Sequence, residues 1–150
     1  MLKLEISSEI KRPVQEVFAY LTDPTTVPEW NSAVLECRAE PPGPLRVGSK
    51  VHTVGSILGR RLEPTLEVTE LTPNKKLVYK TNSPFPLAGT YLTEPTAGGT
   101  KVTIEVAAEP GGFFKLAEPV LGRITKKQFE VQLETIKELL EAREATRVGN

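Results

Sequence analysis

The apolar residues of this chain change from strand spacing to helical spacing near residue 110, and this change limits the fold more than any other feature. Between Ala33 and Glu109, apolar and polar residues alternate in short stretches, which is typical of strands with one buried face. The turns that separate these stretches are short, as in PTAGGT. In the last 40 residues the apolar positions recur every three or four residues instead, which indicates helix. Short strands followed by a separate helical segment predict an α+β fold with an antiparallel sheet.

A further strand and a short helix are expected before this strand region. The stretch LKLEISSEI, residues 2–10, alternates and predicts the first strand. Pro13 is expected to open the helix, at the position where its missing N–H costs nothing. The apolar residues that follow have helical spacing and should form one buried face: Val14, Val17, Phe18 and Leu21.

The stretch VFAYLTDPTTVPEWN predicts a break between two helices. Asp23 should end the first helix, because the residue before Pro24 disfavours helical dihedral angles. Thr26 and Glu29 have the spacing of a capping box, so a second short helix should begin at Thr26. This helix carries Trp30, the only tryptophan of the chain, which is expected either to pack against the bend or to contact the edge of a binding site.

The C-terminal segment is expected to form a short helix and then a long one. Pro119 separates them, so the first should end near Glu118 and the second should run to about Glu144. At 100° per residue, the long helix carries a broad apolar face formed by Leu121, Phe129, Leu133, Ile136 and Leu140. The same face also contains three polar residues, Thr125, Gln128 and Gln132.

Composition narrows the class of protein. The chain has 150 residues, which fits a single domain over residues 1–150, and its 19 basic and 19 acidic residues disfavour a nucleic-acid partner. No stretch approaches the roughly 20 apolar residues of a membrane helix, so no integral membrane association is expected. The N-terminus lacks the pattern of a signal peptide, and Cys37 is the only cysteine, so a cytoplasmic location is expected. The oligomeric state stays open.

Residues with catalytic or metal-binding chemistry are sparse. A catalytic triad or a histidine-based zinc site would need His52, which shares the strand parity of Lys50 and is expected on the solvent side. The paired glycines lack the spacing of nucleotide-binding loops, and the strand carboxylates fall on the polar side. We therefore predict no catalytic residue, no metal site and no cofactor.

A set of polar side chains is nevertheless expected to point toward the interior. Strand parity directs Thr53, Leu77, Tyr79, Tyr91 and Thr93 inward, opposite the polar residues of the long helix. Each alone has an ordinary structural explanation, because a buried Thr or Gln usually satisfies a backbone group. Together they favour a concave, mostly apolar pocket with a few polar groups. The predicted ligand-binding residues are Trp30, Thr53, Leu77, Tyr79, Phe85, Tyr91, Thr93, Leu121, Thr125, Gln128 and Gln132.

Five segments carry a resemblance to a known family: VFAYLTDPTTVPEWN, RVGSKVH, LTPNKKLVYKT, GTYLTEPTAGGTKVTIEV and FKLAEPVLGRITKKQFEVQLETIKELLE. In this order, from about Leu2 to Glu141, they resemble the polyketide cyclase/dehydrase and lipid-transport branch of the START-related (SRPBCC) superfamily. The resemblance implies a helix-grip fold, in which a curved antiparallel sheet of about seven strands wraps around a long C-terminal helix. It also implies two short helices between the first and second strands, and a ligand cavity between the sheet and the long helix.

The resemblance leaves three functions open. Family cavities take lipids, sterols, quinones, plant hormones and polyketides, so binding of a small hydrophobic molecule without catalysis is the first expectation. The alternative is a polyketide cyclase or dehydratase, in which cavity hydroxyls and charged groups position a poly-β-keto chain. No catalytic set of those enzymes can be matched to residues of this sequence. The third is a protein-interaction domain like the chaperone ATPase activators of the superfamily, which would need an exposed apolar patch rather than a cavity.

Overall fold

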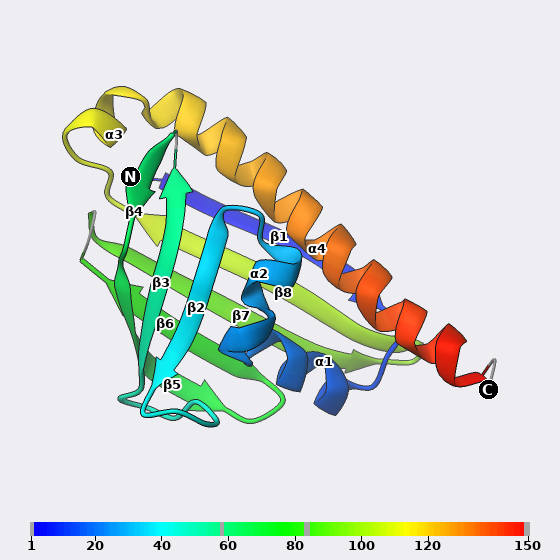
Figure 1. Ribbon diagram of the computed structural model, residues 1–150. Coiled ribbons are helices and arrows are strands. Elements are labelled where there is room, and N and C mark those ends of the chain that lie inside the picture. The colour runs from blue at the N-terminus through cyan, green and yellow to red at the C-terminus, as the bar shows by residue number, and fades with distance from the viewer. Residues whose placement is uncertain (1, 58, 83–84, 149–150) are drawn as a thin grey trace.

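The protein is a curved antiparallel sheet that wraps around one long helix (Figure 1). The computed structural model describes residues 2–57, 59–82 and 85–148. The strands are β1 (Leu2–Ile10), β2 (Val34–Glu40), β3 (Lys50–Ile57), β4 (Arg60–Leu62), β5 (Thr65–Thr72), β6 (Lys76–Thr81), β7 (Leu87–Thr96) and β8 (Gly99–Ala108). The helices are α1 (Val14–Leu21), the 3₁₀ turn η1 (Pro24–Thr26), α2 (Val27–Trp30), α3 (Phe113–Leu116) and α4 (Glu118–Val148). This confirms the predicted helix-grip fold.

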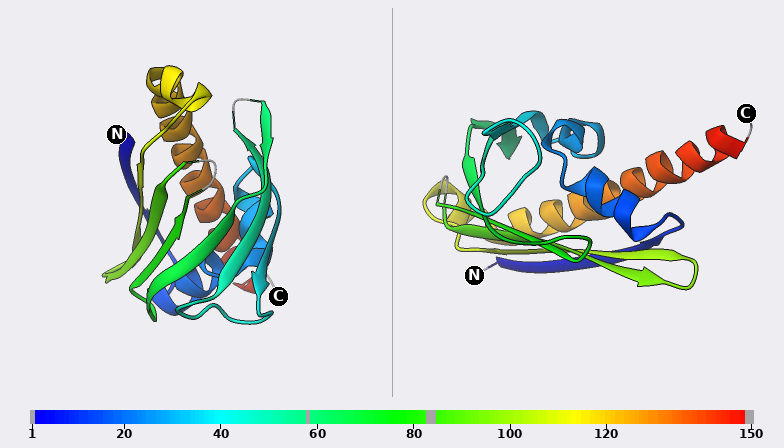
Figure 2. Two further views of the ribbon diagram at one scale, coloured as in Figure 1. Left: turned by 90° about the vertical axis from the view of Figure 1, so that its left-hand side faces the viewer. Right: turned by 90° about the horizontal axis from the view of Figure 1, so that it is seen from below.

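The strand order places the first and last strands of the chain side by side at one edge of the sheet. Seven strands follow the order β1-β8-β7-β6-β5-β3-β2, and β4 pairs with β3 beside this path. The β1 strand pairs with β8, so the first strand lies next to the strand that leads into α3 and α4. Figure 2 shows the sheet curving, with α4 along its concave face. Bulges at Val34–Glu36 and Val68–Glu70 interrupt the ladders and help the sheet to bend.

The main core lies between α4 and the β1–β8 edge of the sheet. Leu133, Ile136 and Leu140 of α4 are almost fully buried against Val102 and Ile104 of β8. This is the apolar face expected from the sequence, and burial of each such side chain contributes roughly 1.5–3 kcal/mol. Within the described residues, no helix has the length and apolarity needed to cross a bilayer.

One predicted strand is divided in two. In the sequence, alternation at Leu62, Leu66 and Val68 predicts one strand over RRLEPTLEVTEL with Pro64 at an edge or a bulge, whereas β4 ends before Pro64 and β5 begins after it. Pro64 has no N–H to donate to a ladder, although its carbonyl accepts a hydrogen bond from the Thr53 N–H at 3.0 Å. On either side of this split, β4 and β5 both pair with β3.

The predicted capping box at Thr26 is wrong. Thr26 already has helical dihedral angles, because η1 continues directly into α2, and its hydroxyl donates backward to the Tyr20 carbonyl at 2.8 Å. The Glu29 carboxylate accepts from the Tyr20 hydroxyl at 2.8 Å instead of from the cap. Asp23 caps η1, accepting from the Thr25 N–H at 3.0 Å.

Pro13 precedes α1 as its N-cap residue rather than opening the helix at its first position, since its dihedral angles are extended. The Trp30 indole N–H donates to the Thr26 hydroxyl at 3.2 Å, and the ring makes an edge contact with Tyr91 at 6.1 Å between centroids. Trp30 is buried, so it packs against the bend.

Candidate functional site

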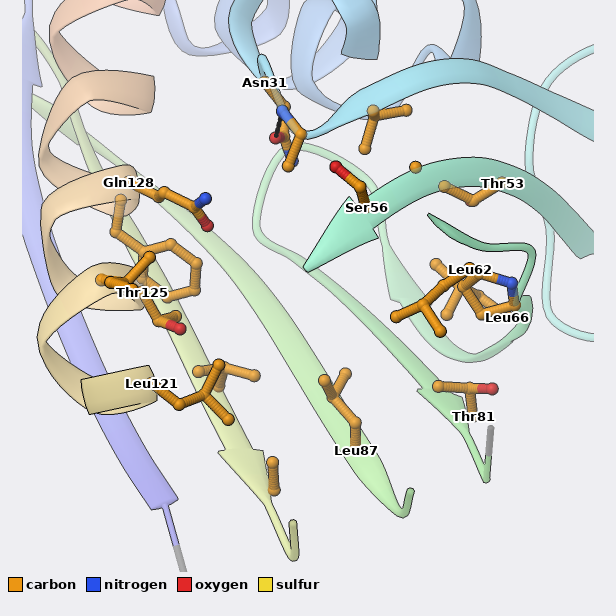
Figure 3. Close-up of a pocket in the computed structure, with 18 of the residues that line it drawn as sticks. Asn31, Thr53, Ser56, Leu62, Leu66, Thr81, Leu87, Leu121, Thr125 and Gln128 are labelled. Carbon is orange, nitrogen blue, oxygen red and sulfur yellow. Dashed lines mark hydrogen bonds between the residues drawn. The ribbon is translucent and has the colours of Figure 1, made fainter. Parts of the chain in front are cut away.

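A pocket of about 210 Å³ lies between α4 and the concave face of the sheet (Figure 3). Leu121, Thr125 and Gln128 point into it from α4, and the opposite wall comes from strands β3 to β7. The pocket adjoins a small apolar cluster of Phe85, Ala108, Phe114 and Leu121, which places it toward the α3 end of the molecule. The long helix and the sheet therefore position the pocket together.

The pocket lining is polar in places but carries no charge. Its polar side chains are Asn31, Thr53, Ser56, Tyr79, Thr81, Thr125, Gln128 and Gln132. None of the lining residues that the structure describes is an Asp, Glu, Lys, Arg or His. A charged ligand would lose its hydration here without gaining a counter-ion, which is costly. The pocket suits an uncharged molecule that is mainly apolar.

Three polar side chains of α4 face the pocket without a partner. Within the described part of the chain, Thr125, Gln128 and Gln132 have no side-chain hydrogen bond. Thr135, one turn further along, differs because its hydroxyl donates to the Val131 carbonyl at 2.8 Å. A buried Gln with no protein partner is uncommon, since buried polar groups are usually satisfied. These groups are thus free to bond with whatever occupies the pocket.

Tyr79 is held over a glycine of the neighbouring strand. Tyr79 of β6 lies directly opposite Gly89 of β7, and a Cβ on Gly89 would lie 2.2 Å from the Tyr79 ring carbon Cζ. The Tyr79 ring also lies 5.7 Å from the Tyr91 ring, centroid to centroid. Burial raises the pKa of both tyrosines, and the Tyr79 hydroxyl raises that of Tyr91 further. Both hydroxyls therefore stay protonated at neutral pH and can donate hydrogen bonds.

A second, smaller pocket of about 110 Å³ adjoins the first one on the side of α1 and α2. The two share the residues that divide them: Asn31, Val34, Thr53, Leu66 and Tyr79. Cys37 lines this inner pocket, and its Sγ lies 3.8 Å from the Thr53 hydroxyl. Burial raises the pKa of the Cys37 thiol, which keeps it in its neutral form.

A wider groove of about 800 Å³ lies elsewhere, between η1 and the loop that follows β2. Most of its lining residues are exposed, and Asp23 and Arg38 are among them. Asp23 and Arg38 bring charged groups to its lining, whereas the described lining of the pocket beneath α4 has none. We therefore take the pocket beneath α4 as the candidate site.

The structure brings most of the predicted site residues together. Those that line the pocket beneath α4 are Thr53, Tyr79, Phe85, Leu121, Thr125, Gln128 and Gln132. Leu77 and Tyr91 line the inner pocket instead. Thr93 lies outside both, and its hydroxyl donates to the Asn74 carbonyl at 2.9 Å. Trp30 borders a separate groove between α2 and α4.

Some lining residues were not predicted. Thr81 and Leu87 share the strand parity of Tyr79 and Tyr91, so extending the same alternation would have found them. Asn31 follows α2 in a turn, and its side chain accepts from the Ala33 N–H at 3.0 Å. Ser56 has the opposite parity to Thr53. Neither Asn31 nor Ser56 follows a periodic pattern that could have singled it out.

The predicted surface position of His52 agrees with the structure. Its ring hydrogen bonds to the Thr65 hydroxyl at 3.0 Å and pairs with the Glu40 carboxylate, away from the pocket. Among the residues that the structure describes, no three His, Cys, Asp or Glu side chains gather where they could hold a metal ion.

Comparisons with known proteins agree with this architecture. A protein from Nitrosomonas europaea is 23% identical, with a TM-score of 0.73 over 96% of this chain and 97% of its own. A protein from Thermus thermophilus is 16% identical, with a TM-score of 0.77 over 94% of this chain and 98% of its own. StfQ, a di-domain ARO/CYC of the steffimycin biosynthetic pathway, is 18% identical, with a TM-score of 0.76. The aligned region covers 96% of this chain but only 52% of StfQ. At these identities the likeness shows the fold alone.

Comparison of the sequence with family models identifies the family as well as the fold. No curated protein matches the chain. The model of the family described as polyketide cyclase / dehydrase and lipid transport, however, matches residues 1–141, nearly the full length. This match covers the strands, both short helices and most of α4. The chain therefore belongs to the polyketide cyclase / dehydrase and lipid transport family of the START-related superfamily.

Proposed function

We propose that this protein binds a small, uncharged, mainly apolar molecule in the pocket beneath α4. A lipid, a quinone or a polyketide-like compound would meet this description. The observation that carries the proposal is the lining, which combines apolar walls with the unpartnered side chains of Thr125, Gln128 and Gln132 and has no charge among its described residues.

Affinity would come mainly from apolar contact. Burial of about 200 Å² of apolar ligand surface is worth roughly 5 kcal/mol before the costs of association are subtracted. The amides of Gln128 and Gln132 can each donate to a ligand carbonyl and accept from a ligand hydroxyl. They would fix the orientation of the ligand, while the apolar walls would supply most of the binding energy.

The family also supports a second candidate, a cyclase or dehydratase. In that case the protonated Tyr79 hydroxyl would donate to a substrate carbonyl and stabilise negative charge as it develops. Enolisation also needs a general base, and the described lining residues supply no carboxylate and no histidine. Binding without catalysis is therefore the better supported function.

A pocket-filling variant tests the proposal. Thr125→Phe places a ring inside the pocket, whereas Glu130→Phe places the same ring on the exposed side of α4. We expect native mass spectrometry of the wild-type protein to show a bound apolar molecule, or thermal denaturation to show stabilisation by members of a lipid, quinone and polyphenol panel. Thr125→Phe should lose these signals and Glu130→Phe should keep them. Equal binding by the two variants would place the ligand elsewhere and contradict the proposal.

A further inference from the structure

Three large apolar side chains are exposed in succession at the α3 end of α4. Leu116 is 89% exposed, Val120 44% and Ile124 37%. Val120 and Ile124 are four residues apart on α4 and lie on one side of that helix, and Leu116 is the last residue of α3, which ends just before α4 begins. We call these three residues the apolar stripe.

The apolar stripe ends at the pocket. Ile124 belongs to both, because it is partly exposed and also lines the pocket beside Leu121. Figure 1 shows α3 and the first turns of α4 at one end of the molecule, beyond the edge of the sheet. A surface that covered the stripe would therefore lie against the edge of the pocket.

Basic side chains lie close to the apolar stripe in the sequence. Four are exposed, and none of them has an ion-pair partner in the described part of the chain: Lys115, Arg123, Lys126 and Lys127. Between Phe113 and Lys127 the only acidic residue is Glu118, so this segment carries a net charge of about +3, as four cations minus one anion. The whole chain, in contrast, has a formal net charge of zero. The basic surplus is local to the stripe.

Exposed apolar residues elsewhere do not show this combination. Leu35 and Val47 are 65% and 62% exposed, but each stands alone on the surface. Val131 and Leu139, further along α4, are 48% and 37% exposed and lie eight residues apart. Isolated exposed apolar residues are normal on a soluble surface. The apolar stripe differs because its three residues lie within residues 116–124, with cations in the same segment and the pocket at its end.

We propose that the apolar stripe docks on the surface of an anionic lipid bilayer. The three apolar side chains would enter the boundary between headgroups and acyl chains, and the four cations would contact lipid phosphates. Docking in this way opens the pocket toward the membrane, so that an apolar molecule could pass between them without crossing water. The inference goes beyond the proposed function, because a protein can bind a ligand from solution without docking on a membrane.

Vesicle co-sedimentation tests the proposal, with phosphatidylcholine vesicles that either contain or lack phosphatidylglycerol. We expect the wild-type protein to bind the anionic vesicles, and to bind less as salt is added, because salt screens exposed charges. Leu116→Ser/Val120→Ser should weaken binding at least tenfold. Lys126→Ala/Lys127→Ala should weaken it roughly fivefold for each cation removed. The control Leu35→Ser/Val47→Ser should bind like the wild type.

Several results would overturn the proposal. These are no binding to either vesicle, equal binding to both, or an equal loss in the control variant. Sedimentation velocity is run in parallel, because a dimer that Leu116→Ser/Val120→Ser abolishes, without vesicle binding, would assign the stripe to a second copy of the chain. Tight binding to an acidic protein without vesicle binding would assign it to a protein partner. Circular dichroism melting checks that each variant is folded.

The same variant separates this inference from the proposed function. Leu116 and Val120 do not line the pocket, so Leu116→Ser/Val120→Ser should keep its thermal stabilisation by apolar ligands in solution. Loss of vesicle binding with retained ligand stabilisation supports docking as a separate property. Vesicle binding without ligand stabilisation would contradict the proposed function but leave the docking surface intact.

Discussion

Tyr79 is the residue on which the geometry of the site depends most. Its ring divides the two pockets and lies over Gly89, where the missing side chain leaves room for it. Strand parity predicted that Tyr79 points inward, since alternation alone determines the face of a residue. The contact with Gly89 could not be predicted, because it depends on the register between two strands and not on the spacing within one of them.

Gly89→Ala should therefore disturb Tyr79 more than an ordinary surface change would. The added methyl group must displace the ring, since Cζ and the hydroxyl oxygen would lie 2.2 and 2.3 Å away. We expect a loss of about 1–3 kcal/mol in the free energy of unfolding, measured by chemical denaturation. In a Tyr79→Leu background, which lacks the clashing atoms, the same substitution should cost clearly less. Gly98→Ala is the control, since its nearest neighbour atom lies at an ordinary 3.5 Å.

The three tyrosines of the chain provide a pH test at the same scale. Burial raises the pKa of Tyr20, Tyr79 and Tyr91 above its ordinary value, and for Tyr20 the hydrogen bond to Glu29 adds to this rise. A raised pKa in the folded state means that the unfolded state loses its phenol protons first. The corresponding stability is fully present below about pH 10 and falls as pH rises further. The phenolate absorbance of the native protein should appear only together with unfolding. A tyrosine that titrates near pH 10 in the folded protein would contradict this burial.

At the scale of elements, α4 carries both the core and the polar wall of the pocket. The sequence predicted its start near Pro119 and its buried face, because proline position and helical period are local signals. The absence of partners for Gln128 and Gln132 was not predictable in this way. Whether a buried amide bonds to the backbone or faces a pocket depends on what lies opposite, which is set by the curvature of the sheet.

Gln132→Leu should separate stability from binding. Gln132 is only 6% exposed and has no side-chain hydrogen bond among the described residues, so its amide loses part of its hydration without gaining a protein partner. Replacement by leucine should leave the free energy of unfolding unchanged or raise it by about 1 kcal/mol. The same change should weaken stabilisation by a pocket ligand. Leu133→Ala is the matched core control and should cost about 2–5 kcal/mol. A loss of stability in Gln132→Leu comparable to that of Leu133→Ala would show that Gln132 is structural.

In the helical break before β2, the hydrogen bonds of Thr26 and Glu29 could not be predicted from their spacing. Thr26 and Glu29 have the spacing of a capping box, but both side chains serve the turn around Tyr20 and Trp30. The same residues at the same spacing can satisfy either network. Tertiary contacts with the Tyr20 hydroxyl and carbonyl decided between them. The prediction of a break was right because proline forbids a continuous helix, whatever the surrounding contacts.

At the scale of the whole molecule, the order of the helices and strands could be predicted from the sequence. The strand period, the change to helical period near residue 110 and the family segments together predicted the sheet that grips α4. The volume of the pocket and its division into two parts could not be predicted from the sequence. They depend on the bulges at Val34–Glu36 and Val68–Glu70 and on the split at Pro64, which set the curvature of the sheet.

The absence of charge in the described lining is the property of the whole site that most limits what it can bind. Isothermal titration calorimetry with a straight-chain alcohol and the carboxylate of equal chain length tests it directly, since the two probes differ mainly in charge. We predict that the alcohol binds at least tenfold more tightly at neutral pH, because the carboxylate would be desolvated without a counter-ion. Thr125→Phe should abolish binding of the alcohol, whereas Glu130→Phe should not. Equal or tighter binding of the carboxylate would contradict the account of this pocket as a site for an uncharged apolar ligand.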